Sequence, residues 1–253
     1  MQISQRKFIE KVLSKFNMAD CKYSAIPTQP KLHIEPSASC KKVLPYKELI
    51  GCLMYLMMGI RADLSFLVSY FSKFQNCYDT IHLKNLKHVL RYPNKTKDIC
   101  LQYGRSNGAV VYAFVDADSA NDPHDRKNVN NFFTRVFGNN VIWKSKKQPC
   151  VSLSSTEAEY IMSVRGLVFG INHRCIRCTT KPSKHVSVKH HFVKDIVQDK
   201  VLKLVYVDSH NQVAYVLIKA LPYSKFQYYV TGLGMSELGE VFKRAILMCK
   251  VAL

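Results

Sequence analysis

The sequence predicts an α/β fold in which a mixed sheet with flanking helices follows a mainly helical segment. Three observations predict it. Between Val110 and Tyr160, three runs rich in Val, Phe, Ile and Trp are separated by Asn, Asp, Pro and Gly, which is typical of strands and turns. The next segment opens at Ser154 or Ser155 with acidic residues in its first turn, which indicates a helix. Residues 1–97 instead carry apolar side chains at helical spacing.

The first expected helix is capped by Ser4, whose hydroxyl can accept a bond from a backbone amide of the first turn. Its apolar face consists of Phe8, Val12, Leu13 and Phe16. After a loop rich in proline and serine, a second helix is expected from Pro45 to about Gly59, because a first helical turn accepts proline.

A third helix is expected from Asp63 to Phe74, and a fourth begins at Thr80. The inward residues of the fourth helix are Leu83, Leu86, Val89 and Leu90. It stops at Pro93, because proline has no amide hydrogen and its ring collides with the preceding helical turn.

The strands follow from the alternation of apolar runs and turn residues. The first strand is Ile99–Tyr103 or Ala109–Asp116, and the pattern leaves both alternatives open. Phe132–Phe137 and Asn140–Lys144 come next and complete a three-strand meander.

The charge balance favours a polyanionic partner. Lys and Arg number 37 against 18 Asp and Glu, which gives a formal net charge of +19 spread along the chain. Such an excess favours nucleic acid as the partner over a small-molecule substrate. One basic helix side consists of Lys84, Lys87, His88 and Arg91, continued by Lys95 and Lys97. The spacing alone fits a phosphate-binding stripe and an ordinary solvated helix face equally well.

The cysteine pattern and the apolar runs indicate the cellular compartment in which the protein is expected. The chain has nine cysteines without a repeating spacing, which suits a reducing compartment better than a disulfide framework. The first twenty residues lack the apolar stretch of a signal peptide. The longest apolar run, Leu49–Ile60, is too short to span a bilayer and is expected as a buried helix. We therefore expect an intracellular protein, cytoplasmic or nuclear, that is neither secreted nor bound to a membrane.

Carboxylates gather at the ends of the expected elements. The first strand of the meander delivers Asp116 and Asp118, and the following helix delivers Glu157 and Glu159. Carboxylate oxygens are the ligands of Mg²⁺. Two such cations about 4 Å apart can stabilise the attacking and the leaving oxygen of a phosphodiester.

Several motifs in this order carry a family resemblance. DADSAND, IWKSKKQ and SLSSTEAEY resemble the ribonuclease H domain of a copia-type retrotransposon Pol polyprotein. PYKELIGCLMYLMMGIRADLSF and HLKNLKHVLRYPNKTKDICLQY resemble the connection between that domain and reverse transcriptase, and ISQRKFIEKVLSKFNMADCK resembles the end of the polymerase thumb. The resemblance covers roughly Ile3 to Met235.

The resemblance implies a division of the chain. Residues 1–97 would be a reverse transcriptase thumb and connection remnant, mainly helical. Residues 98–235 would form a ribonuclease H-like domain with an internal deletion near 171–183, which removes one core strand. Residues 236–253 have no counterpart in the family and would be an unrelated tail.

The resemblance also assigns residues to a site. Asp116 matches the first metal-binding aspartate, and Glu159 is preferred over Glu157 as the metal-binding glutamate, because a large apolar residue and then a smaller one follow the family's ligand. Nucleic-acid contacts are expected from Lys84, Lys87, Arg91, Lys144, Lys146 and Lys147.

Two of the family's four metal-binding carboxylates are missing. The segment that carries the third falls in the deletion, and Tyr215 stands in place of the fourth aspartate. A phenol with a pKa of about 10 offers no charge at neutral pH, so we expect the Mg²⁺ pair of the family not to assemble. The copy is therefore expected to be degenerate and catalytically inactive.

Alternatives remain open at this stage. An active Mg²⁺-dependent ribonuclease H would need a substitute acid such as Asp208 or Asp195, although Asp208 is better placed to cap the last helix. A module that binds nucleic acid without chemistry is the other reading. Cys175 and Cys178, with His173 and His185 nearby, could ligate zinc, but the second paired motif of a zinc ribbon is lacking.

Overall fold

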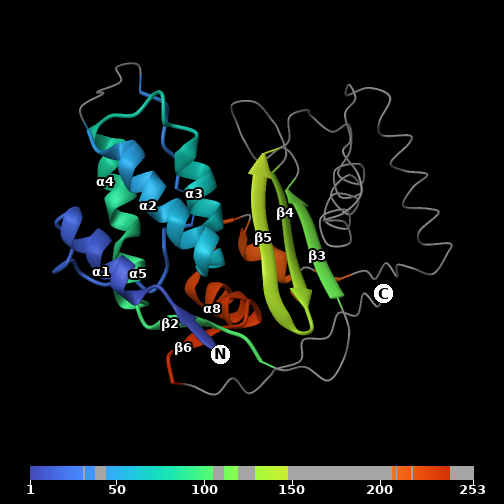
Figure 1. The fold of residues 1–253 in the computed structure, drawn as a ribbon. Helices are drawn as coiled ribbons and strands as arrows, with labels where there is room; N and C mark the ends of the chain where they lie inside the picture. The colour runs from blue at the N-terminus through green and yellow to red at the C-terminus, as the bar shows by residue number, and fades with distance from the viewer. Residues whose placement is uncertain are drawn as a thin grey trace, which may run out of the picture. The chain divides into compact units, whose positions relative to one another are not determined.

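The computed structural model describes residues 1–30, 32–37, 44–104, 111–118, 129–147, 207–208, 210–217 and 219–239. The chain divides into two compact units. Unit 1 comprises Met1–Gln102 and Lys219–Arg244, and unit 2 comprises Tyr103–Ile218 and Ala245–Leu253. The described residues form a mixed α/β protein with two three-stranded antiparallel sheets (Figure 1).

Unit 1 contains the helices and one small sheet. Its helical elements are α1 (Arg6–Lys15), α2 (Tyr46–Gly59), the 3₁₀ helix η1 (Ala62–Leu64), α3 (Ser65–Ser72), α4 (Thr80–Val89), α5 (Arg91–Lys95) and α8 (Tyr223–Gly232). Their apolar faces form a common core, in which Leu49, Leu56, Leu64, Phe71 and Leu86 are fully buried. A helical segment was expected here, and its elements fall close to the predicted places.

Helix α1 differs in two details from the sequence prediction. Its N-cap is Gln5, not Ser4, although the Ser4 hydroxyl still accepts a bond from the Arg6 amide at 3.2 Å. Ile9 is 1% exposed and lies deeper in the core than the predicted Phe8, which is half-buried. The ring of Phe8 instead packs at 4.5 Å from the ring of Tyr55.

Helix α2 begins directly after Pro45 and ends at Gly59, as the sequence predicts. Its inner side is buried, but Tyr55 and Met58 are 60% and 68% exposed, so the expectation of a wholly buried helix is wrong for the outer side. Apolar residues all round a helix do not by themselves show which side is covered. Within the described ranges, no helix combines the length and the apolar character needed to cross a membrane.

The helix predicted to stop at Pro93 ends earlier, and a second short helix contains the proline. Helix α4 ends at Val89, Leu90 keeps helical dihedral angles, and α5 runs from Arg91 to Lys95. The stop was predicted because proline breaks a helix interior. In the structure a new helix begins at Arg91, so Pro93 lies in a first turn, where amide hydrogens need no intrahelical partner.

The sheet of unit 1 joins three distant parts of the chain. Strand β2 (Ile99–Gln102) lies between β1 (Gln2–Ser4) and β6 (Met235–Glu237), and both pairings are antiparallel. Ile3 pairs with Leu101, and Leu101 pairs with Met235. Strand β6 takes in the first two residues of the tail that was expected to begin at residue 236.

Unit 2 contains the predicted meander. Strands β3 (Val111–Asp118), β4 (Val129–Val136) and β5 (Asn139–Lys147) pair in this order. The two alternatives for the first strand therefore both exist as strands, in different sheets. The 3₁₀ helix η2 (Val213–Leu217) packs against β3 and β4.

A two-residue turn closes the β4–β5 hairpin. Val136 pairs with Asn139, and the residues between them, Phe137 and Gly138, have φ angles of 51° and 72°. Positive φ at both central residues is the type I′ geometry that matches the twist of the strands. The Asn139 side chain ties the hairpin to the start of the unit, since it donates to the Gly104 carbonyl at 2.9 Å and accepts from its amide at 2.7 Å.

Candidate functional site

The expected metal ligand Asp116 lies near the end of β3, as predicted for a strand. Its backbone pairs with Asn131 of β4, and Asn131 pairs with Ser145 of β5. Asn131 has no exposed surface. This row across the meander is thus polar, while the row two residues earlier along β3 joins the buried Phe114 to the fully buried Phe133.

Several other predicted site residues fall outside the described residues. Glu157 and Glu159 belong to this group, and so do Asp195, the cysteines of the CxxC motif and the region near 171–183. The distance between Asp116 and Glu159, and the zinc alternative, therefore stay untested predictions.

Tyr215, which stands where the resemblance expects an aspartate, lies in the middle of η2. Its side chain is half-buried, whereas Val213, Ala214, Val216 and Leu217 are buried. Because η2 packs against β3, the element that carries Tyr215 contacts the strand that carries Asp116. The described residues of η2 bring no carboxylate to this contact.

Asp208 holds a turn ahead of η2. One carboxylate oxygen accepts from the amides of His210 at 2.9 Å and Asn211 at 3.0 Å, and the other accepts from the Asn211 side chain at 2.8 Å. These bonds, above all the one from the Asn211 side chain, lower the pKa of the exposed Asp208 carboxyl. Its carboxylate oxygens accept bonds from its own turn, which precedes η2, so the capping of the last helix by Asp208 stays a prediction.

A preassembled metal site is absent from the part of the chain that the structure describes. No group of three or more His, Cys, Asp or Glu side chains lies there in a position to hold a metal ion.

The predicted basic residues of the fourth helix lie along α4 and α5, which follow one another in the same direction (Figure 1). We call Lys84, Lys87, Arg91 and Lys95 the basic stripe. Lys84 and Lys95 are exposed, and Lys87 and Arg91 are half-buried. Lys84 and Lys87 share one side of α4, and Arg91 and Lys95 share one side of α5. Leu90 between the helices keeps helical dihedral angles, so the two pairs continue along the same direction. Between Thr80 and Lys97 the sequence contains no Asp or Glu.

Several acidic residues of unit 1 have partners away from the stripe. Ion pairs connect Arg6 with Glu10 and Asp98, and Lys15 with Glu48, and Asp79 is hydrogen-bonded to His82 in the cap of α4. Among the described residues, no acidic side chain pairs with the basic stripe. Its positive charge is therefore not neutralised by an ion pair within the part of unit 1 that the structure describes.

The three predicted lysines of unit 2 lie on β5. Lys144 is exposed, and its backbone pairs with Phe132. Lys146 and Lys147 pair with Asn130 and Val129 at the end of the strand.

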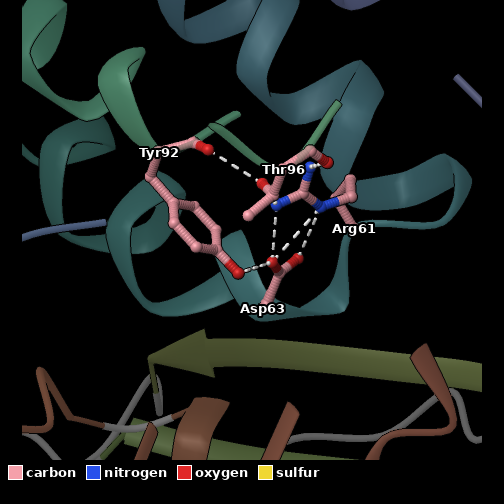
Figure 2. Close-up of polar contacts among 4 residues, drawn as sticks. All are labelled: Arg61, Asp63, Tyr92 and Thr96. Atoms are coloured by element: carbon pink, nitrogen blue, oxygen red, sulfur yellow. Dashed lines mark hydrogen bonds and ion pairs between the residues drawn. The ribbon is translucent and has the colours of Figure 1, made fainter. Parts of the chain in front are cut away.

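A buried polar cluster joins α5 to the start of η1, and the sequence did not predict it (Figure 2). Arg61 and Asp63 form an ion pair at 2.7 Å, and neither side chain has exposed surface. The Tyr92 hydroxyl donates to the Asp63 carboxylate at 2.6 Å. Arg61 also donates to the Thr96 carbonyl at 3.2 Å and to the Thr96 hydroxyl at 2.8 Å. We call these four residues the buried cluster.

The buried cluster satisfies its own charges. Burial works against the positive charge of Arg61, but the adjacent Asp63 carboxylate outweighs it and raises the pKa of Arg61. Burial, reinforced by Asp63, raises the pKa of Tyr92 well above its ordinary value. Tyr92 is therefore a neutral donor, and the cluster is an ion pair closed by hydroxyl hydrogen bonds.

Comparison with known proteins gives a consistent result. The chain is 29% identical over 268 residues to the retrovirus-related Pol polyprotein from transposon TNT 1-94 of Nicotiana tabacum, which covers 92% of this chain. It is 29% identical over 268 residues to the Pol polyprotein from transposon RE1 of Arabidopsis thaliana, which covers 94% of it. Over most of its length the chain is therefore similar to copia-type retrovirus-related Pol polyproteins of transposons.

The chain is retrotransposon-derived, and it spans about a fifth of the length of these relatives, 20% and 18% respectively. It is also 38% identical over 120 residues, 47% of its length, to Secreted RxLR effector protein 161 of Plasmopara viticola, of which it covers 84%. No protein-family model matches the chain, and no solved structure matches it.

One sequence signal could have pointed to the buried cluster. The long apolar run of α2 ends directly in an Arg and an Asp two residues apart. Charged residues beside a buried helix end need partners if they are covered. The partners Tyr92 and Thr96 lie about thirty residues further on and leave no local pattern.

Proposed function

We propose that the chain is a nucleic-acid-binding remnant of the ribonuclease H end of a Pol polyprotein, without hydrolytic activity. The observation that carries the proposal is the basic stripe, whose charges meet no acid among the described residues. The similarity to Pol polyproteins supports it, since such proteins are encoded by transposons.

The shape of the stripe suits a phosphate backbone. From Lys84 to Lys95 it extends roughly 16 Å along the helix direction at the helical rise of 1.5 Å per residue. Cations in a row along this length can contact successive phosphates and release their counterions. An RNA–DNA hybrid is the proposed ligand of the stripe, and Lys144, Lys146 and Lys147 of β5 are proposed as nucleic-acid contacts of unit 2 in their own right.

A ribonuclease H-like fold is part of the proposal for residues 98–235. The antiparallel meander β3–β4–β5, with Asp116 near the end of its first strand, supports it. Residues 1–97 would then be the thumb and connection remnant, and residues 236–253 the tail without a family counterpart.

The proposed inactivity follows from the acids that are missing. Asp116 and Glu159 would hold Mg²⁺ in the family, and the cation would there activate a water and stabilise the phosphodiester oxygens. In this chain Tyr215 replaces one ligand, and Asp208, a possible substitute, uses both carboxylate oxygens in its own turn. The remaining carboxylates are too few to bring two cations together.

Binding can be tested by fluorescence anisotropy of a labelled RNA–DNA hybrid at several salt concentrations. For the double variant Lys84→Gln/Lys87→Gln, we expect the slope of log K against log salt to fall by about 2 in magnitude, since each lost phosphate contact removes about 0.9. The control Lys7→Gln/Lys11→Gln removes the same charge from exposed positions of α1 and should leave the slope nearly unchanged. Equal losses in both variants would contradict a binding role for the stripe.

Inactivity can be tested on the same hybrid in Mg²⁺ and in Mn²⁺, with Asp116→Asn beside the unchanged chain. We expect no cleavage above background from either protein. Cleavage by the unchanged chain that disappears in Asp116→Asn would overturn the proposal and establish an active ribonuclease H with a substitute ligand.

A further inference from the structure

We propose that the buried cluster is the positioning element of the basic stripe. It holds the one-turn helix α5 in the rotation that aligns Arg91 and Lys95 with Lys84 and Lys87. This inference rests on the proposed binding function and deepens it, because it names residues that affect binding without contacting the ligand.

Helix α5 cannot keep its orientation by itself. It has five residues, and one of them, Pro93, contributes no amide hydrogen. Isolated helices far longer than one turn are already marginal in water. The backbone bonds from Asn94 to Leu90 and from Thr96 to Tyr92 must therefore be stabilised by contacts with other parts of unit 1.

The contacts of the buried cluster reach α5 at both of its ends. Tyr92, the second residue of the helix, donates its hydroxyl to Asp63 at 2.6 Å. Thr96, the C-cap, accepts two bonds from Arg61, one at its hydroxyl and one at its carbonyl. A guanidinium at this carbonyl satisfies an acceptor that the helix end leaves open and opposes the negative end of the helix dipole. Figure 2 shows the four side chains converging.

These contacts fix the rotation of the helix about its axis. Tyr92 and Thr96 are four residues apart and share one side of α5, and Arg91 and Lys95 each lie one residue earlier, about 100° around the axis. When the Tyr92 side is held against Asp63 and Arg61, the direction of the Arg91 side is determined. The Tyr92 ring adds to this hold through an edge contact with Phe226 of α8 at 5.5 Å between centroids.

The alternative is a purely structural role, in which the cluster stabilises unit 1 without directing the stripe. A variant that loosens α5 without changing charge separates the two roles. Tyr92→Phe/Thr96→Val removes the hydroxyl donor to Asp63. It also removes the Thr96 hydroxyl, which accepts from Arg61 and donates to the Tyr92 carbonyl at 2.8 Å, and it keeps the size of both side chains. The phenylalanine ring retains the contact with Phe226.

A matched control exists in the same unit. Tyr46 has no exposed surface and donates its hydroxyl to the Phe71 carbonyl at 2.8 Å, and Ser72 donates its hydroxyl to the Val68 carbonyl four residues earlier. The double variant Tyr46→Phe/Ser72→Ala therefore removes one buried phenol hydroxyl and one hydroxyl with a helical carbonyl partner. These hydroxyls make no bond to α4 or α5.

The experiment is a mutant cycle in which the binding of an RNA–DNA hybrid is measured at several salt concentrations. It uses four proteins and the control variant. They are the unchanged chain, Arg91→Gln/Lys95→Gln, Tyr92→Phe/Thr96→Val and the combined quadruple variant. We expect Arg91→Gln/Lys95→Gln to lower the slope of log K against log salt by about 2. The neutral variant Tyr92→Phe/Thr96→Val should lower it by a similar amount, and the quadruple variant should lower it no further. The control Tyr46→Phe/Ser72→Ala should keep the slope.

The outcomes separate the inference from the proposed function. If Arg91→Gln/Lys95→Gln leaves the slope unchanged, the stripe is not the interface and the proposed function fails together with the inference. If this variant lowers the slope but Tyr92→Phe/Thr96→Val does not, the binding function stands and the inference is wrong. Additive losses in the quadruple variant would also overturn it.

A second measurement keeps the inference testable if the double variant unfolds. Hydrogen exchange of the Asn94 and Thr96 amides in the single variant Tyr92→Phe should become faster, while exchange within α2 stays unchanged. In Tyr46→Phe the two amides of α5 should keep their protection. Unchanged α5 protection in Tyr92→Phe would contradict the inference.

Discussion

The buried cluster and the basic stripe lie in the same unit and meet at α5, yet they treat charge in opposite ways. In the cluster, the positive charge of Arg61 has a carboxylate at 2.7 Å and no contact with solvent. Along the stripe, the four cations form no ion pair with an acidic side chain of the described residues. The position of the acidic side chains, more than the number of cations, therefore decides the role of a positive charge. A cation beside a buried carboxylate is structural, and a cation without an acidic neighbour can bind a partner.

The first prediction tests the buried side of this comparison and has the largest expected effect. Asp63→Ala leaves Arg61 and the Tyr92 hydroxyl buried without their acceptor, so the free energy of unfolding should fall by about 3–5 kcal/mol. Urea unfolding followed by circular dichroism measures the change. The control Glu48→Ala breaks the exposed pair with Lys15 and should alter stability little. Similar losses in both variants would mean that burial of the pair is unimportant.

The second prediction concerns an acid that neither neutralises the stripe nor belongs to the cluster. Asp79 caps α4, because its carboxylate accepts from the amides of Ile81 at 2.8 Å and His82 at 3.1 Å. Asp79→Ala should lower the free energy of unfolding by about 1 kcal/mol, the usual contribution of such a cap. A loss of stability beyond that of Asp63→Ala would invert the ranking of the two acids.

The pH dependence of this cap has a definite sign. Hydrogen bonding to His82, with help from the backbone amides, lowers the pKa of Asp79 to about 2. A carboxyl with a depressed pKa in the folded state contributes stability above its unfolded pKa of about 4 and loses it as the pH falls towards 2. In Asp79→Ala, the decline of stability across this window should be shallower than in the unchanged chain.

The third prediction concerns His88, which lies beside the stripe, and has the smallest effect. Burial, and then the charge of Arg91, lower the pKa of His88, whose ring nitrogen lies 3.1 Å from the Arg91 guanidinium. The folded state therefore disfavours protonation, and stability should decline as the pH falls through the ordinary histidine pKa of about 6.5. Thermal melting at pH 7.5 and pH 5.5 should show a smaller difference in His88→Gln. An identical difference would mean that His88 titrates freely.

Local signals in the sequence were enough to predict the elements of the fold. Pro45 marked the start of α2, and alternation between apolar runs and turn residues located β4 and β5 within a few residues. The side that each element buries was less predictable, as Tyr55 and Met58 on the outer side of α2 show. Periodicity reports which residues share a side, but the covering surface comes from elsewhere in the chain.

Contacts between distant residues escaped the sequence analysis for a physical reason. The buried cluster joins residues about thirty positions apart, and the β2–β6 pairing joins Cys100 to Ser236. Such pairs depend on the path of the whole chain and leave no periodic pattern near either partner. For the candidate site, Asp116 was correctly placed on a strand, while its relation to Glu159 stays a prediction.

The sheet of unit 1 also limits the order in which its strands can pair during synthesis. Strand β2 reaches its partner β6 only after more than 130 further residues have been synthesised, and the polypeptide that becomes unit 2 comes between them. On a ribosome, the edge of β2 must stay without this neighbour while that polypeptide emerges. Pairing over such a separation is slow and leaves strand edges open to other chains. A shortened copy that ends before Met235 would keep this edge open permanently, so it should depend on chaperones more than the full chain does.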